Sequence, residues 1–140
     1  MKNPGNFIVK IGTNTKDLID YCGGIIGDDV TIKAGGPMMG FLLTDTNVPI
    51  MKGSNGIIAV DTDHTVEQPC IKCGRCMDVC PMELSPLYFA KFADEENWQG
   101  MKDKNVMDCI ECRCCEYICS SKIPLVTKIK AGKNAVRGMK

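Results

Sequence analysis

Cysteine side chains at short, regular spacings are the feature of this sequence with the clearest potential for chemistry. The chain of 140 residues contains ten cysteines, and eight of them form two runs with one pattern. The runs are Cys70-x2-Cys73-x2-Cys76-x3-Cys80 and Cys109-x2-Cys112-x2-Cys115-x3-Cys119. Thiolates at this spacing ligate the irons of a [4Fe–4S] cluster. The two runs therefore predict two [4Fe–4S] clusters.

The spacing also predicts which cysteines share a cluster. Three cysteines of one run can surround three corners of a cube, and in bacterial two-cluster ferredoxins the fourth cysteine ligates the other cluster. We therefore assign Cys70, Cys73, Cys76 and Cys119 to cluster one. Cys109, Cys112, Cys115 and Cys80 are assigned to cluster two. This crossed ligation would tie the two runs together and hold the clusters close to each other.

Two other uses of so many cysteines fit the pattern less well. Zinc sites usually combine two Cys-x2–4-Cys pairs across a longer loop, and a third cysteine repeated in both runs does not fit that scheme. Disulfides are typical of secreted chains, and the first residues, Met1 to Gly5, lack the apolar stretch of a signal peptide. Iron–sulfur ligation is the interpretation that the spacing favours.

The second run departs from the first at two places. Ser120 stands where Pro81 follows the first run, and Arg113-Cys114 stands where the first run has Gly74-Arg75. Cys114 is thus an extra thiol beside a predicted ligand. Two interpretations stay open for it: a small hydrophobic residue that only packs, or a spare ligand or redox-sensitive thiol.

Composition limits the classes of function. Lys and Arg number 17 and Asp and Glu number 17, so the net charge is zero and no electrostatic footprint for nucleic acid is present. No apolar run approaches the roughly 20 residues that span a bilayer. Oxygen-labile clusters held by thiolates need a reducing interior, which predicts a cytoplasmic protein.

The region before the cysteines, residues 1–62, has a glycine-rich pattern with short elements. The expected strands are 6–11, 30–34, 48–51 and 56–60, and the expected helix is 15–22, ended by Gly23-Gly24. Between two strands lies the loop Gly35-Gly36-Pro37-Met38-Met39-Gly40. Its glycines would allow close approach to a ligand or partner, or would simply make a tight connection. These elements predict a small α+β domain with one helix on a mixed sheet.

Residues 63–69 form a polar linker to the cysteine-rich domain, 70–140. Ser85-Pro86 opens a helix with proline in its first turn, and a second short helix is expected to begin over 94–98. A basic helix carrying Lys128, Lys130, Lys133 and Arg137 closes the chain. Its basic face is either solvated or a docking surface for an acidic partner or an anionic membrane.

With these motifs in hand, the chain resembles the C-terminal part of the RnfC subunit of the Rnf electron-transport complex. The resemblance rests on both cysteine runs, the loop 35–40, Lys52-Gly53-x-Asn55-Gly56-Ile57, Cys80-Pro81-Met82 and Cys109-Ile110-Glu111-Cys112. Relatives of that family include cobalamin reductases and a proline-reductase-associated electron-transfer protein. The resemblance implies a β-grasp-like, soluble-ligand-binding (SLBB) domain followed by a helical, bacterial-type 2[4Fe–4S] ferredoxin-like domain.

The resemblance also implies a function and partners. The clusters would relay single electrons between a flavin- or NADH-linked donor domain and other subunits of an electron-transfer complex, with peripheral membrane association through those subunits. FMN and NADH would bind a domain that precedes this region in the family, since the chain has no G-x-G-x-x-G. We therefore do not expect the chain to be catalytic alone. The alternative is a partner-docking or corrinoid-like ligand-binding module whose clusters are structural.

Overall fold

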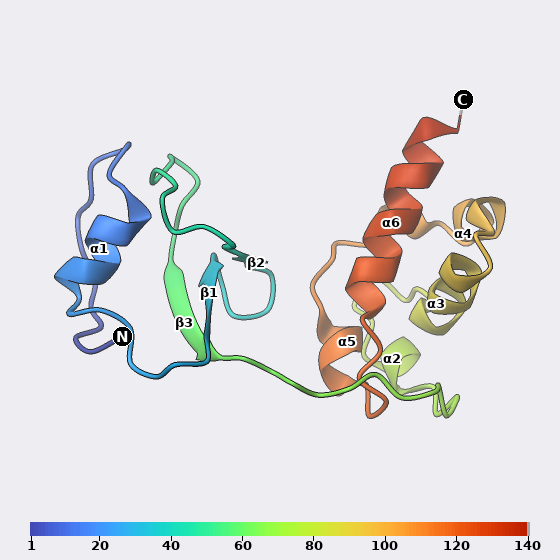
Figure 1. Cartoon of the computed structure of the whole chain (residues 1–140). Helices are drawn as coiled ribbons and strands as arrows, with labels where there is room; N and C mark the ends of the chain where they lie inside the picture. The colour runs from blue at the N-terminus through green and yellow to red at the C-terminus, as the bar shows by residue number, and fades with distance from the viewer. Residues whose placement is uncertain (140) are drawn as a thin grey trace. The chain divides into compact units, whose positions relative to one another are not determined.

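The computed structural model describes residues 1–139, which form two compact units, Met1–His64 and Thr65–Lys140 (Figure 1). The first unit contains one helix and a small sheet, and the second is helical. The prediction of an α+β chain with a helical cysteine-rich region is confirmed. Among the described residues, no helix is long and apolar enough to cross a membrane.

Helix α1 (Thr15–Tyr21) in the first unit begins at the predicted residue and ends one residue before the predicted end, with Cys22 as its C-cap. The side chain of Asn14 accepts a hydrogen bond from the Lys16 amide at 2.9 Å, as an N-cap residue does. Gly23 and Gly24 follow the helix with φ of +79° and +80°. Glycine adopts this left-handed conformation without a Cβ clash, so the pair ends the helix. Ile19 and Cys22 are buried beneath it.

Three antiparallel strands form the sheet of the first unit, in the order β2-β1-β3. Strand β1 (Val30–Ala34) is central and pairs along its whole length with β3 (Ile57–Asp61). The short strand β2 (Phe41–Leu42) pairs with the end of β1, with Phe41 opposite Ala34. The sheet is therefore antiparallel throughout, and the mixed sheet that we predicted is wrong.

Two of the predicted strands do not form. Residues 6–11 and 48–51 carry no strand, and an isolated bridge between Asn14 and Pro49 is their nearest equivalent. Ile8 is fully exposed, so the apolar residues of 6–11 do not line one buried face as a strand requires. Pro49 has no amide hydrogen to donate to a ladder. Next to the first segment, the Gly12 N–H donates to the Ile50 carbonyl at 2.8 Å, without forming a ladder.

The second unit consists of short helices around one long helix. In chain order they are α2 (Arg75–Asp78), α3 (Pro86–Asp94), α4 (Trp98–Asp103), the 3-10 helix η1 (Val106–Asp108), α5 (Cys114–Ile118) and α6 (Leu125–Gly138). Helix α6 packs against α3, α4, α5 and η1, while α2 packs against α5 (Figure 1). The second short helix expected to begin over 94–98 is α4, which begins at Trp98 after its N-cap residue Asn97, while Asp94 still belongs to α3.

The two cysteine runs fold as a structural repeat. Backbone φ is positive at Lys72, Gly74 and Glu83 in the first half of the unit. It is positive again at the corresponding positions of the second half, Glu111, Arg113 and Lys122. Helices α2 and α5 begin after Gly74 and Arg113, and α3 and α6 follow at matching places. The repeated cysteine spacing thus corresponds to a repeated backbone conformation.

The core of the second unit has two parts. One groups Phe89, Met101, Val106, Ile129 and Val136, and the other groups Ala90, Cys115, Ile123, Leu125 and Val126. Helix α6 contributes to both parts, so its apolar face is the common wall of the unit. The second part includes Cys115, a predicted cluster ligand, so this thiol lies inside the core.

Candidate metal centres

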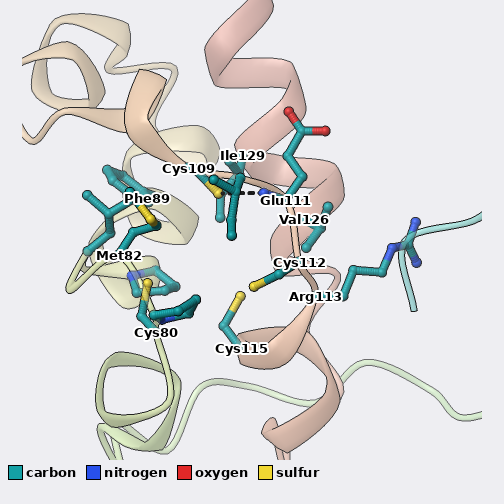
Figure 2. Close-up of a pocket in the computed structure, with 14 residues that line it drawn as sticks. Cys80, Met82, Phe89, Cys109, Glu111, Cys112, Arg113, Cys115, Val126 and Ile129 are labelled. Carbon is teal, nitrogen blue, oxygen red and sulfur yellow. Dashed lines mark hydrogen bonds between the residues drawn. The ribbon is translucent and has the colours of Figure 1, made fainter. Parts of the chain in front are cut away.

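The four cysteines assigned to cluster two line one cavity. Cys80 follows α2, Cys109 and Cys112 lie on the loop after η1, and Cys115 lies on α5. Figure 2 shows the sulfur atoms of Cys80, Cys112 and Cys115 directed into the same space. The rest of the wall is largely apolar, formed by Leu84, Pro86, Phe89, Val126 and Ile129 among others. A donor set of four thiols with an apolar wall suits a [4Fe–4S] cluster.

The four cysteines assigned to cluster one line a second, more open cavity. Cys70, Cys73 and Cys76 come from the first loop and α2, and Cys119 comes from the residue after α5. Charged side chains surround this space: Glu67, Lys72, Arg75, Lys91, Asp94, Glu95 and Lys128. The two cavities therefore differ in polarity, which the matching cysteine spacings do not reveal.

No single-ion site accompanies these cavities. Within residues 1–139, no three His, Cys, Asp or Glu side chains converge on a point where one metal ion would bind. The thiols of each set therefore do not meet at one point, as the ligands of a single ion would. This arrangement fits a polynuclear cluster better than the zinc alternative, although the assignment of individual ligands stays a prediction.

Both loops direct a backbone amide at the first cysteine of their run. The amide of Lys72 donates to Cys70 Sγ, and that of Glu111 donates to Cys109 Sγ, each at 3.4 Å. The left-handed φ of these two residues turns the amide toward the sulfur. Hydrogen bonds to ligand sulfur are one of the means by which a protein sets the potential of a cluster. The structure supplies one in each loop.

Arg113 holds the left-handed position that Gly74 occupies in the first loop, with φ of +65° against +80°. An L-residue in this conformation costs about 1–2 kcal/mol. Arg113 donates to Glu116 at 3.3 Å, and the other carboxylate oxygen of Glu116 accepts from the Val126 amide at 2.8 Å. Glu116 therefore caps α6, whose own N-cap residue, Pro124, makes no side-chain bond. The second loop thus has an arginine bonded to Glu116 at the position where the first loop has Gly74.

Burial affects the protonation of several thiols. It raises the pKa of Cys115 to about 12, and it also raises the pKa of Cys76 and Cys109. Removal from water disfavours the charged thiolate. These thiols are therefore protonated at neutral pH before iron binds, and cluster assembly must release protons.

A buried ion pair lies against the cluster-two loop. Lys133 is 7% exposed, and its Nζ donates to the Cys109 carbonyl at 2.8 Å and to Glu111 Oε1 at 2.7 Å. Lys130 approaches the other oxygen of Glu111 at 3.6 Å. The hydrogen bond from Lys133 lowers the pKa of Glu111, against the opposing effect of burial.

We considered that the basic residues of the last helix form a solvated face, but Lys133 is buried and does not belong to such a face. Lys133 continues the apolar register of Val126 and Ile129 on α6, and all three are buried. A lysine at helical spacing within an apolar stripe was the signal that sequence reasoning missed. Lys128 is also mostly covered, because it pairs with Asp94 and Glu67 at 2.6 and 3.5 Å.

The remaining candidate residues lie outside the two cavities. Cys114 is not among the lining residues, and a hydrogen bond with Cys112 raises its pKa. In the loop 35–40, Met39 is 63% exposed, while the Gly40 amide bonds to the Gly36 carbonyl at 2.8 Å. The spare-ligand role of Cys114 and the ligand or docking role of the loop stay predictions. The tight bonding within the loop favours a structural part for its glycines.

Comparison with known proteins gives two domain matches. Residues 1–42 match the SLBB domain, and residues 63–120 match the 4Fe-4S dicluster domain. The second match confirms the prediction of two [4Fe–4S] clusters, and the order of the two domains is the predicted order.

Similar proteins come from several bacteria. The chain is 43% identical over 112 residues to the C subunit of the proton-translocating ferredoxin:NAD(+) oxidoreductase complex of Clostridium ljungdahlii, covering 77% of this chain and 24% of the relative. It is 38% identical over 139 residues to the C subunit of the Na(+)-translocating ferredoxin:NAD(+) oxidoreductase complex of Acetobacterium woodii, covering 97% and 31%. The C subunit of the ion-translocating oxidoreductase complex of Rhodobacter capsulatus is 42% identical over 89 residues, covering 61% and 17%. The chain thus spans less than a third of the length of these relatives, and with its SLBB and dicluster domains it is a C-terminal RnfC-like part.

Proposed function

We propose that the chain relays single electrons between a flavin- or NADH-linked donor and another subunit of an Rnf-like complex. The observation that carries the proposal is the pair of cavities, each lined by four cysteines drawn from both runs. A [4Fe–4S] cluster bound there would accept and donate one electron at a time. A relay needs two such centres near each other, and the packing of α2 against α5 supplies this proximity.

The crossed ligation would make the relay a single folded unit. Cys80 reaches the second cavity from the first half of the repeat, and Cys119 reaches the first cavity from the second half. Loss of either cysteine would therefore loosen both halves. Ligation free energy would also be folding free energy here, since Cys115 lies in the core and Cys76 and Cys119 pack against it.

Both ends of the proposed relay are open to partners. Ile71 is 68% exposed and Ile110 is 51% exposed, and they occupy corresponding positions of the two cluster loops. An exposed apolar side chain beside each cavity suits contact with a donor at one end and an acceptor at the other. The polar rim of cavity one and the apolar wall of cavity two would let these two partners differ in surface chemistry.

The test begins with the full chain expressed and purified without oxygen. We expect roughly eight irons and matching sulfide per chain, and two interacting EPR signals that appear and disappear reversibly in a redox titration. One cluster, zinc, or clusters that never cycle would contradict the relay. Inert clusters would instead support a structural role.

Single substitutions test the ligand assignment. Cys119→Ser is expected to perturb the signal of cluster one, and Cys80→Ser that of cluster two, although each residue lies in the other run. Cys22→Ser is the matched control, because Cys22 is buried in the first unit and lines neither cavity. Equal effects of Cys119→Ser and Cys22→Ser would contradict the crossed scheme.

The first unit offers a second role, docking to another subunit. Met39, Phe41 and Leu42 are 63%, 58% and 57% exposed and lie close together in a single hairpin. Such a group of apolar side chains suits a protein interface. We expect Phe41→Ser with Leu42→Ser to reduce co-purification with the other subunits while leaving the iron content unchanged. The proposal also places the chain at the cytoplasmic face of a membrane through those subunits.

A further inference from the structure

We propose that Lys133 is a positioning residue that raises the reduction potential of cluster two. The proposal rests on the proposed relay function, because it needs a cluster that cycles. The feature that carries it is a buried ammonium group bonded directly to the loop of Cys109. Among the described residues, Lys133 is the one charged side chain that is buried.

The contacts of Lys133 connect α6 to the cluster loop. Its Nζ donates to the backbone carbonyl of Cys109 at 2.8 Å and to Glu111 Oε1 at 2.7 Å. Between these residues the loop carries the bond from the Glu111 amide to Cys109 Sγ. Lys133 thus holds both residues that form this bond. Its charge is bonded to the backbone of the residue that carries the sulfur, in a region where water is largely excluded.

The carboxylate of Glu111 accepts a hydrogen bond from Lys133 and offsets part of this charge. In Figure 2 the carboxylate of Glu111 points away from the sulfur atoms of Cys80, Cys112 and Cys115. Its second oxygen faces Lys130, whose side chain is 47% exposed. The group of two lysines and one glutamate keeps a net positive charge. Lys133 is the buried member of the pair of lysines, and Lys130 is the partly exposed one.

Cluster one lacks an equivalent. The residue that corresponds to Glu111 is Lys72, which is exposed. In the part of the chain that the structure describes, no lysine or arginine side chain donates to a carbonyl of residues 70–76. Lys128 lies near that cavity but is neutralised by Asp94 and Glu67. The charge effect therefore acts on cluster two alone.

The direction of the effect follows from electrostatics. Reduction adds one negative charge to the cluster, and a nearby cation stabilises the reduced state. Screening by salt acts strongly on exposed charges and weakly on buried ones. The lower effective dielectric of the interior also strengthens the interaction. Removing the ammonium of Lys133 must then lower the potential of cluster two.

The experiment compares the potentials of both clusters in full-length, anaerobically purified variants by EPR-monitored redox titration. For Lys133→Met we expect the ratio of reduced to oxidised cluster two at a fixed potential to fall about tenfold, which corresponds to about 59 mV for one electron. Cluster one should not change. Arg137→Gln is the control, because it removes an exposed charge from the same helix.

Further variants keep the proposal falsifiable if Lys133→Met fails to fold. Lys133→Arg should keep the potential near that of the parent, and Glu111→Gln should raise it by leaving the ammonium uncompensated. Lys130→Met should lower it less, and added salt should remove that smaller effect. A potential that is equal in the parent, Glu111→Gln and Lys133→Met proteins would overturn the proposal. Absence of two reversible signals in the parent would instead overturn the relay function itself.

Discussion

Replacing Gly40 with alanine should destabilise the first unit through a clash with the backbone. A Cβ added at Gly40 would lie 2.5 Å from the Gly36 carbonyl oxygen and 2.8 Å from that of Ala34. Neither oxygen can rotate away as a flexible side chain could. The next residue, Phe41, pairs with Ala34 in the sheet. Any shift that relieves the clash must therefore disturb the pairing of β1 with β2.

The magnitude follows from the cost of overpacking, which is about 1–3 kcal/mol when the backbone must move. Gly36→Ala is the matched control in the same loop, because an added Cβ there meets nothing within 4 Å and φ is not positive. We expect Gly36→Ala to leave the unit unchanged or to stabilise it slightly, since alanine restricts the unfolded chain. The two variants differ in sterics alone.

Hydrogen exchange read by mass spectrometry on peptides covering β1 and β2 measures the effect in the intact chain. A loss of about 1–3 kcal/mol corresponds to roughly 5- to 150-fold faster exchange. Peptides of the second unit and the iron content serve as internal references. Equal exchange rates in Gly40→Ala and Gly36→Ala would refute the reasoning.

Three further predictions address other parts of the molecule. Gly132→Ala brings a Cβ within 2.3 Å of the buried Met101 side chain, so the second unit should be less stable. In denaturant, its cluster absorbance should be lost about 5- to 30-fold faster than in the parent. Gly138→Ala is the control and should have little effect, because an added Cβ there meets nothing within 4 Å. Chelating the iron should increase hydrogen exchange in α2 and α5 but not in the first unit, which lacks the cysteine runs. Hydrogen bonds from His64 and then Thr62 lower the pKa of Asp29, so in His64→Ala a carboxyl NMR titration should show that pKa rising toward 3.8. The stability from this lowered pKa is present above pH 3.8 and is lost as the pH falls through the lower, folded-state value.

Local sequence signals were enough to predict the helices and strands whose ends are marked by turn or capping residues. Helix α1 has Asn14 before it and two glycines after it, and α3 has Pro86 in its first turn. Strand β1 alternates apolar and polar residues, and β3 is a short apolar run that follows a turn. In contrast, 6–11 and 48–51 have strand-like composition without a partner that completes a ladder. Strand pairing is a non-local property, and it overrode composition at both segments.

The cysteine spacing predicted the donor sets, and the structure brings those sets together around two cavities. The cysteine spacing does not predict which other residues surround each cavity. Leu84 and Phe89 line cavity two, where α3 packs on α6. Glu67 and Asp94 line cavity one, where both pair with Lys128. These contacts depend on tertiary packing between segments far apart in the sequence. A repeat in sequence therefore need not produce two equal electrostatic environments.

Helix α6 links the two environments. Lys128 pairs with Glu67, just before the cluster-one loop, and Lys133 bonds to the cluster-two loop, while Val126 and Ile129 fill the core near both of them. A helix fixes the spacing of these side chains rigidly. Any displacement of α6 would alter the charges near both clusters at once. Contact of a partner with this helix would then change the driving force for electron transfer between the clusters, without touching either ligand set.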